Sequence, residues 1–180
     1  MRTVGPAEDR HLLAALAGGD LSALHSLYQA YAHTVYQMLL LHTASREDAE
    51  DLLQETFLSL VDRGRRVTGI RNVRAYLLKV ALNKAGQLYG RRSSMRVSVH
   101  NISLADTDAT LPHDRMEALR VQRALEQLPL EQAEVVVLKV WHDCTFAEIA
   151  EVLDIPMNTA ASRYRYGLEK LQRMLGDDDG

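Results

Sequence analysis

The residues with the clearest chemical potential are cations rather than nucleophiles. Arg163, Tyr164, Arg165 and Tyr166 alternate near the C-terminal end, and residues 63–105 contain ten Lys or Arg and no Asp or Glu. The flanking segments are acidic, so the whole chain has a net charge of −3. Because ordinary surfaces mix both signs, this asymmetry predicts a polyanion, most simply nucleic acid, as a partner. The alternative is a solvated basic helix without a partner.

Catalytic chemistry has little support in the sequence. His142, Asp143 and Cys144 are adjacent, but adjacent residues at a helix end do not converge on one point, and no second histidine is placed to complete a thiol site. The single cysteine excludes an internal disulfide and a cysteine-rich metal site, and the seven histidines lack a paired helical spacing. We therefore expect no enzyme activity, no cofactor and no metal.

The composition bounds the class of protein. With 180 residues, 47% apolar and 25% charged, the chain has room for two small globular domains. No apolar run is long enough to span a membrane, and the first residues lack the layout of a signal peptide. The expected location is the cytoplasm, without membrane insertion.

Helical patterns fill the first half of the chain. Apolar residues at three-and-four spacing predict helices over 10–17 and 21–41, and a third follows Ser45, whose spacing to Asp48 suits a capping box. One side of this third helix is acidic and polar, which on charge alone indicates a solvated face. That side carries Glu47, Asp51, Gln54, Glu55 and Leu58.

A basic loop over 63–72 leads into a fourth helix. Asn72 can cap this helix. Its inner stripe is expected to hold Val73, Leu77, Val80, Ala81, the stem of Lys84 and Leu88. Between 93 and 114 the periodicity gives way to Ser, Thr, Asp and Asn, which predicts a flexible linker. The expected fold is all-α, with helical domains over 1–92 and 115–176 joined by this linker.

The second domain contains two short helical patterns on either side of Asp154-Ile155-Pro156. Asp154 can adopt the left-handed conformation of a tight turn, and Pro156 cannot continue the first helix. Asn158 or Thr159 is expected to cap the second helix. The pattern predicts a helix-turn-helix, whose second helix enters the major groove, against the alternative of a plain helical hairpin. Its outward residues are Asn158, Thr159, Ser162, Arg163, Arg165 and Tyr166.

Two stretches resemble a known family. DAEDLLQETF, and LEQLPLEQAEVVVLKVW followed by TFAEIAEVLDIPMNTAASRYRYGLEKLQRML, are similar to regions two and four of an extracytoplasmic-function (ECF) sigma factor of bacterial RNA polymerase. Two independent motifs in the right order make the resemblance specific. It implies binding of core polymerase and promoter DNA, transcription initiation, and in many relatives an anti-sigma factor as a further partner.

The resemblance also implies roles for particular residues. The helix matching DAEDLLQETF would dock on polymerase through Asp51, Gln54 and Glu55. The next helix would face the minus-ten promoter element and the helix-turn-helix the minus-thirty-five element. The implied minus-ten contacts are Arg71, Arg74, Tyr76, Lys79, Asn83, Lys84, Arg91 and Arg92.

Some positions depart from the family pattern. Tyr76 stands where Trp is usual, Leu82 replaces an arginine, Gln87 stands at an Asp position and Asp154 at a Gly position. The missing arginine leaves open a sigma-like protein that binds polymerase without opening DNA. A free-standing helix-turn-helix regulator is a second alternative, although it leaves DAEDLLQETF and the basic segment unexplained.

Overall fold

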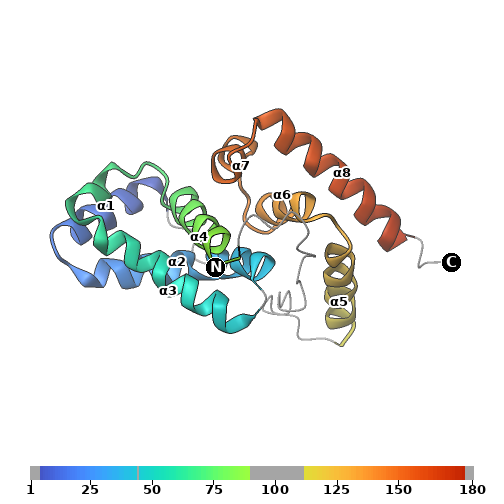
Figure 1. Cartoon of the computed structure of the whole chain (residues 1–180), viewed down its shortest axis with the longest axis horizontal. Helices are drawn as coiled ribbons and strands as arrows, with labels where there is room; N and C mark the ends of the chain where they lie inside the picture. The colour runs from blue at the N-terminus through green and yellow to red at the C-terminus, as the bar shows by residue number, and fades with distance from the viewer. Residues whose placement is uncertain (1–4, 44, 90–111, 177–180) are drawn as a thin grey trace.

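The structure is a computed structural model that describes residues 5–43, 45–89 and 112–176, and within these ranges it contains helices and no strand. Figure 1 shows two groups of helices, α1–α4 and α5–α8. The prediction of an all-α fold with two small helical domains is therefore confirmed. The elements are α1 (Pro6–Ala17), α2 (Leu21–His42), α3 (Arg46–Asp62), the 3₁₀ helix η1 (Gly64–Gly69), α4 (Val73–Tyr89), α5 (Pro112–Glu126), α6 (Leu130–Val140), α7 (Phe146–Leu153) and α8 (Met157–Gly176).

The first domain is built around α2, which contacts α1, α3 and α4. Leu27, Val35, Met38 and Leu39 of α2 are fully buried. Polar side chains define the helix starts. Asp20 accepts from Ser22 N, Ser45 from Asp48 N and Asn72 from Ala75 N, which satisfies amide groups that a helix leaves free at its first turn.

The second domain packs α8 against α6 and α5, with α7 between α6 and α8 in the sequence. A Cβ atom at Gly167 of α8 would lie 2.8 Å from Val136 Cγ2 of α6. The absence of a side chain at Gly167 therefore lets these two helices approach closely. Pro129 separates α5 from α6, as its missing amide hydrogen predicts.

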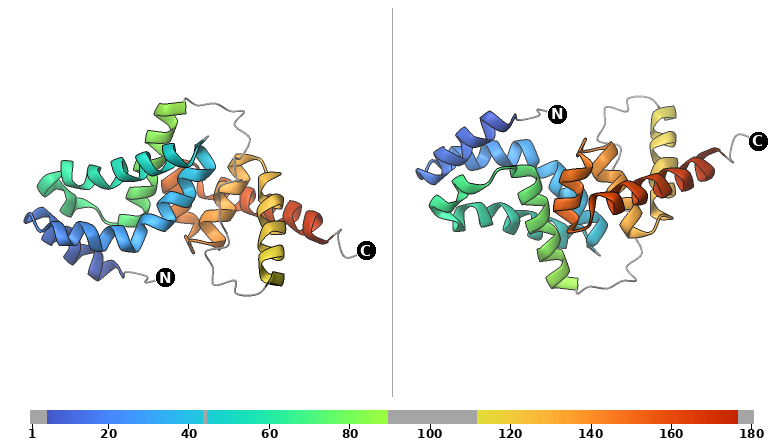
Figure 2. Two further views of the ribbon diagram at one scale, coloured as in Figure 1. Left: turned by 90° about the horizontal axis from the view of Figure 1, so that it is seen from below. Right: turned by 90° about the horizontal axis from the view of Figure 1, so that it is seen from above.

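The two domains also touch each other. α7 packs on α4, and α6 contacts the C-terminal half of α2, where His42 Nε2 lies 2.7 Å from Glu134 Oε1. The two views of Figure 2 likewise place α7 and α6 beside the first domain. Most of the linker predicted over 93–114 lies outside the described residues, and α5 begins inside that range, at Pro112, because proline suits the first turn of a helix.

Several local expectations need correction. α1 begins at Pro6 rather than Arg10, and part of the basic loop forms η1. Leu88 is 57% exposed, because the buried face of α4 shifts to Leu78 and Ala85 toward its end. α8 begins at Met157, and the amides of Thr159 and Ala160 donate to Pro156 O, so neither Asn158 nor Thr159 is the cap.

Candidate nucleic-acid and protein interfaces

The polar side of α3 faces solvent. Asp51, Gln54 and Glu55 are exposed on one face of the helix, and Leu58 beside them is 55% exposed although it is apolar. Glu55 Oε2 accepts from Lys84 Nζ of α4 at 2.7 Å, and both side chains remain partly open to water. An exposed leucine among carboxylates is typical of a protein-binding surface, since it gains free energy when a partner covers it.

The outward side of α4 carries only part of the predicted set. Lys79 and Asn83 are exposed, Arg71 is exposed just before the helix, and Tyr76 is half-buried. The guanidinium carbon of Arg63 lies 5.2 Å from the centre of the Tyr76 ring, a cation–π distance. This side therefore presents cations around an aromatic ring, which suits a polyanion with exposed bases.

Two other predicted cations of α4 point elsewhere. Arg74 turns toward the second domain, where Nη1 donates to His142 O at 2.7 Å and Nη2 to Glu148 Oε1 at 3.0 Å. Lys84 turns toward α3, as described above. Arg91 and Arg92 lie outside the described residues. The structure thus separates Arg74 and Lys84 from the outward side of α4.

The helix-turn-helix has the predicted turn. Thr145 and Glu148 form a reciprocal capping box at the start of α7, and Asp154 ends α7 with φ 55° and ψ 48°, the left-handed conformation. Ile149 is fully buried in α7, and Ala160 and Leu171 are buried in α8. The turn thus fixes α8 on the domain with its opposite face outward.

The outward face of α8 is largely open. Asn158, Arg165 and Tyr166 are exposed, and Arg165 lies over the Tyr166 ring at 4.9 Å. Thr159 and Ser162 are half-buried, and Ser162 Oγ donates to Thr159 O.

Arg163 lies at the edge of this face, where Nη2 is 2.8 Å from Glu131 Oε2 of α6. Since the Glu131 side chain is 68% exposed, water screens this pair and the guanidinium can exchange partners at little cost. All six predicted residues therefore belong to one helix, with Arg163 held at the side.

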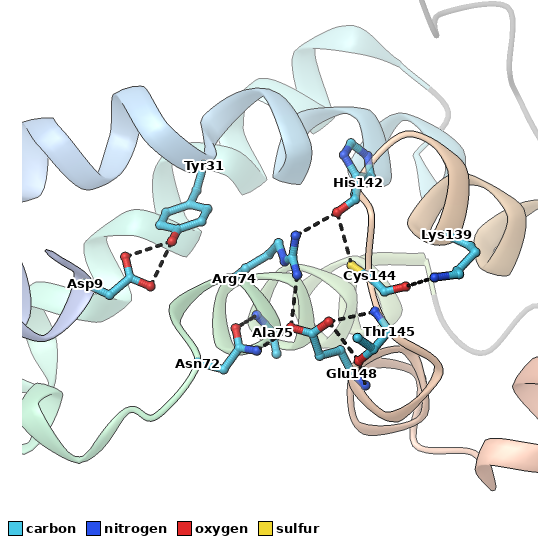
Figure 3. Close-up of polar contacts among 10 residues, drawn as sticks. All are labelled: Asp9, Tyr31, Asn72, Arg74, Ala75, Lys139, His142, Cys144, Thr145 and Glu148. Carbon is cyan, nitrogen blue, oxygen red and sulfur yellow. Dashed lines mark hydrogen bonds and ion pairs between the residues drawn. The ribbon is translucent and has the colours of Figure 1, made fainter. Parts of the chain in front are cut away.

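The contact between α4 and α7 is strongly polar (Figure 3). Glu148 Oε1 accepts from Asn72 Nδ2 at 2.8 Å and from Arg74, while Oε2 accepts from Thr145 N at 2.7 Å. Burial alone would raise the pKa of Glu148, but the hydrogen bonds from Thr145, Asn72 and Arg74 outweigh it and hold the pKa at about 2. Glu148 is therefore ionised at neutral pH.

Cys144 and His142 lie next to this contact. Burial raises the pKa of the Cys144 thiol to about 11, so the thiolate nucleophile is scarce at neutral pH. Burial, with smaller electrostatic contributions from His33 and Arg74, lowers the pKa of His142 to about 4. Among the residues that the structure describes, neither ring nitrogen of this buried histidine has a hydrogen-bond partner. The low pKa keeps the ring neutral at pH 7.

Over the described parts of the chain, no group of three His, Cys, Asp or Glu side chains could hold a metal ion. Within the same ranges, every helix is too short or too polar to cross a membrane.

Two residues of these surfaces were not foreseen from the sequence. Arg63 belongs to the noted arginine-rich loop, but its position over Tyr76 depends on how η1 folds back. Glu148 is three residues after Thr145, a spacing that predicts its capping role but not its contact with a residue 74 positions earlier.

Comparison with known proteins agrees with this geometry. A model of sigma-70 region 2 matches residues 27–94, and a model of sigma-70 region 4 matches residues 118–171. The RNA polymerase sigma factor CarQ of Myxococcus xanthus is 31% identical over 162 residues, which cover 88% of this chain and 92% of CarQ. The ECF RNA polymerase sigma factor SigM of Mycobacterium tuberculosis is 28% identical over 170 residues, covering 93% of this chain and 85% of SigM.

Solved structures show the same fold. CnrH, in complex with the cytosolic domain of CnrY, superposes with a TM-score of 0.65 at 24% identity, covering 96% of this chain and 99% of CnrH. The sigma factor RpoE of Bartonella quintana, in complex with the anti-sigma factor NepR, gives a TM-score of 0.60 at 17% identity and covers 83% and 94% of the two chains.

The fold, the helix-turn-helix and these relatives together define a transcription initiation factor. The chain belongs to the extracytoplasmic-function sigma factors of bacterial RNA polymerase. It therefore acts with core RNA polymerase in promoter recognition.

Proposed function

We propose that α3 docks this sigma factor on core polymerase through Asp51, Gln54 and Glu55, in a domain that extends over residues 1–92. The observation that carries the proposal is the exposed face of α3, where these residues surround Leu58. Leu58 would supply the apolar centre of the contact, and the carboxylates would select a basic partner surface.

The outward side of α4 is proposed to hold the minus-ten element. Lys79, Asn83 and Arg71 would contact phosphates or bases there, and Tyr76 would stack on or pack beside an exposed base. Opening base pairs costs several kcal/mol, so strand contacts and polymerase binding must both offset it. Arg74, Lys84, Arg91 and Arg92 complete the proposed set.

The second domain, residues 115–176, is proposed to read the minus-thirty-five element with α8. The exposed Asn158, Arg165 and Tyr166 are placed for phosphates and base edges, together with Thr159 and Ser162. Arg163 would leave Glu131 to make a bidentate contact with a guanine.

The proposed function also implies a regulatory partner, a cellular location and a lack of enzyme activity. CnrH was solved with the cytosolic domain of CnrY and RpoE with an anti-sigma factor, and we infer a protein regulator of that kind for this chain. Its partners are in the cytoplasm, which is its proposed location. We further infer that it has no enzyme activity of its own, in keeping with the protonated Cys144 thiol.

Gel filtration with bacterial core RNA polymerase tests the docking proposal. We expect the wild type to co-elute and a Gln54→Ala, Glu55→Arg double variant to bind roughly a hundredfold more weakly, since a reversed charge faces a basic surface. The matched control, Glu8→Arg with Gln29→Ala, changes exposed residues of α1 and α2 by the same chemistry and should co-elute.

If the double variant co-elutes with core polymerase as well as the wild type does, the docking role of α3 fails. Tight, specific promoter binding by the isolated chain at physiological salt would instead support a free-standing regulator. Circular dichroism of each variant checks that the helices are intact.

A further inference from the structure

The first turn of α8 carries an exposed apolar side chain that the proposed reading residues do not include. Met157, the first residue of the helix, is 55% exposed, whereas Ile155 in the preceding turn packs on the hydrophobic core. Single exposed apolar side chains are common on protein surfaces, so this exposure alone indicates no partner. Met157 differs from the other exposed apolar residues by its position in the helix-turn-helix.

The backbone of the turn holds Met157 at the leading end of α8. The amides of Thr159 and Ala160 donate to Pro156 O at 2.9 and 3.1 Å, so the helix begins at Met157 on a main-chain carbonyl. Each Cα–Cβ bond in a helix tilts toward the N-terminus, so the side chain of the first residue extends past the helix end. In a helix-turn-helix, the N-terminal residues of the second helix contact base edges in the major groove. Met157 is therefore placed among the first side chains to meet the bases.

The surroundings of Met157 favour DNA over an oppositely charged protein surface. Residues 157–168 contain two arginines and no Asp or Glu. Asn158 beside Met157 is exposed, and Ala161, one turn further along the same side of the helix, carries only a methyl group. The first turns of α8 are thus free of negative charge and sterically open, as a helix that enters a DNA groove must be.

The chemistry of methionine selects one base in that groove. Base edges there present hydrogen-bond donors and acceptors, and thymine adds an apolar group, its C5-methyl. The thioether of Met157 is flexible and polarisable, so it adapts to an apolar neighbour, and covering both groups removes them from water. Asn158 has the amide that pairs with adenine N6 and N7. Both side chains at the start of α8 therefore suit an A·T pair.

We propose that Met157 is a specificity-determining residue of this sigma factor, which selects a thymine of the minus-thirty-five element by covering its C5-methyl group. This inference rests on the proposed function, which assigns α8 to that element. Arg163 would prefer a guanine through charged hydrogen bonds, so the two residues read different bases by different chemistry. Met157 adds an apolar contact to a proposed set of polar side chains.

Replacement of thymine by uracil tests this contact, because it removes only the methyl group and keeps the base pairing. The protein is the full chain bound to core polymerase, and the probe is a fluorescein-labelled promoter duplex recovered by selection from a randomised library. Each thymine of its minus-thirty-five element, on either strand, is replaced in turn. We expect one replacement to weaken binding about three- to fivefold, the effect of one buried group of methyl size.

Variants of Met157 assign that effect to the side chain. Met157→Ala should weaken binding to the thymine duplex by a similar factor and bind the thymine and uracil duplexes equally, because both changes remove the same contact. Met157→Leu should keep the preference for thymine, whereas Met157→Gln, similar in length but polar, should lose it. All three replacements are good helix formers. The matched control, Leu119→Ala, shortens an apolar side chain of α5 that is 50% exposed and should retain the uracil effect.

Several results would overturn the role of Met157. These are a selected element without thymine on either strand, a uracil series without effect on the wild type, or a uracil effect that persists in Met157→Ala. Loss of co-elution with core polymerase in Met157→Ala would assign the side chain to a protein contact and would also contradict the proposal. Circular dichroism checks that each variant keeps its helices.

Failure of the proposed function gives a different result. If scrambling the upstream element leaves binding of the polymerase complex unchanged, α8 does not read that element and both proposals fail. If scrambling weakens binding and Arg163→Ala relaxes the base preference, while no uracil replacement affects the wild type, the proposed function stands and only the role of Met157 fails.

Discussion

The two helices proposed to contact the promoter differ in how much of their surface is free. On α8, Arg165 and Tyr166 are open to solvent, and Arg163 is tied only to a carboxylate within its own domain. On α4, Arg74 is bound to the other domain and Lys84 to α3. The free chain thus exposes the helix proposed to read the minus-thirty-five element, while two cations of the helix proposed for the minus-ten element are engaged in ion pairs within the chain.

The charge distribution along the chain explains this difference. Residues 63–105 carry cations alone, while the segments on either side have an excess of carboxylates. At physiological salt the Debye screening length is about 8 Å, so charges attract mainly at short range. In the free chain the nearest carboxylates to the basic segment are therefore those of the acidic segments on either side of it. The partners in the structure, Glu55 and Glu148, come from opposite flanks.

Arg163→Ala tests the open helix and should have the largest effect. Loss of a bidentate contact to guanine should reduce discrimination at one upstream base position by roughly 1–3 kcal/mol. Selection from a library of randomised promoters, with polymerase present, measures this as a relaxed preference at that position.

The matched variant is Arg165→Ala, two residues away and exposed over Tyr166. A phosphate contact there predicts weaker binding to all sequences alike, without a change in base preference. An unchanged preference in Arg163→Ala would remove that arginine from the reading residues.

Acid should destabilise the region around His142, next to the contact between α4 and α7, and leave the outward face of α8 unaffected. His142 has a pKa of about 4 in the folded chain, below the usual 6.5. Between these pH values the unfolded chain binds a proton at this ring that the folded chain does not. Stability is full above pH 6.5 and falls as the pH drops toward 4, by about 2 kcal/mol at pH 5. Urea unfolding at pH 7 and pH 5, followed by Trp141 fluorescence, measures the loss.

The groups that face this ring are His33 of α2 and Arg74 of α4, both of which disfavour its protonation. His142→Gln should remove most of the pH dependence in this window, whereas His11→Gln, on an exposed position of α1, should retain it. Glu148, with a pKa of about 2, is ionised throughout this window. The stability that its low pKa provides is lost only as the pH falls below its unfolded value of 4.5. A pH dependence that survives His142→Gln would assign it to another group.

The elements that sequence predicts well are those fixed locally. The cap at Asn72 and the left-handed turn at Asp154 follow from the chemistry of single side chains, and both are present. The start of α8 was missed because the carbonyl of Pro156 takes the place of a side-chain cap. The contact of Glu148 with Arg74 could not be predicted, because it joins residues 74 apart whose meeting depends on how two complete domains pack.

A matched glycine pair tests whether the two helices differ in packing as well as in charge. Gly167→Ala in α8 places a methyl group 2.8 Å from Val136 Cγ2, and the branched valine cannot easily move aside. We expect a loss of about 1–2 kcal/mol by overpacking. Gly86→Ala in α4 meets nothing within 4 Å and should stabilise its domain by about 0.5–1 kcal/mol, because alanine favours the helix. Thermal unfolding measures the change in stability of both variants. Equal effects of the two changes would show that α8 packs no more tightly on its domain than the end of α4 does.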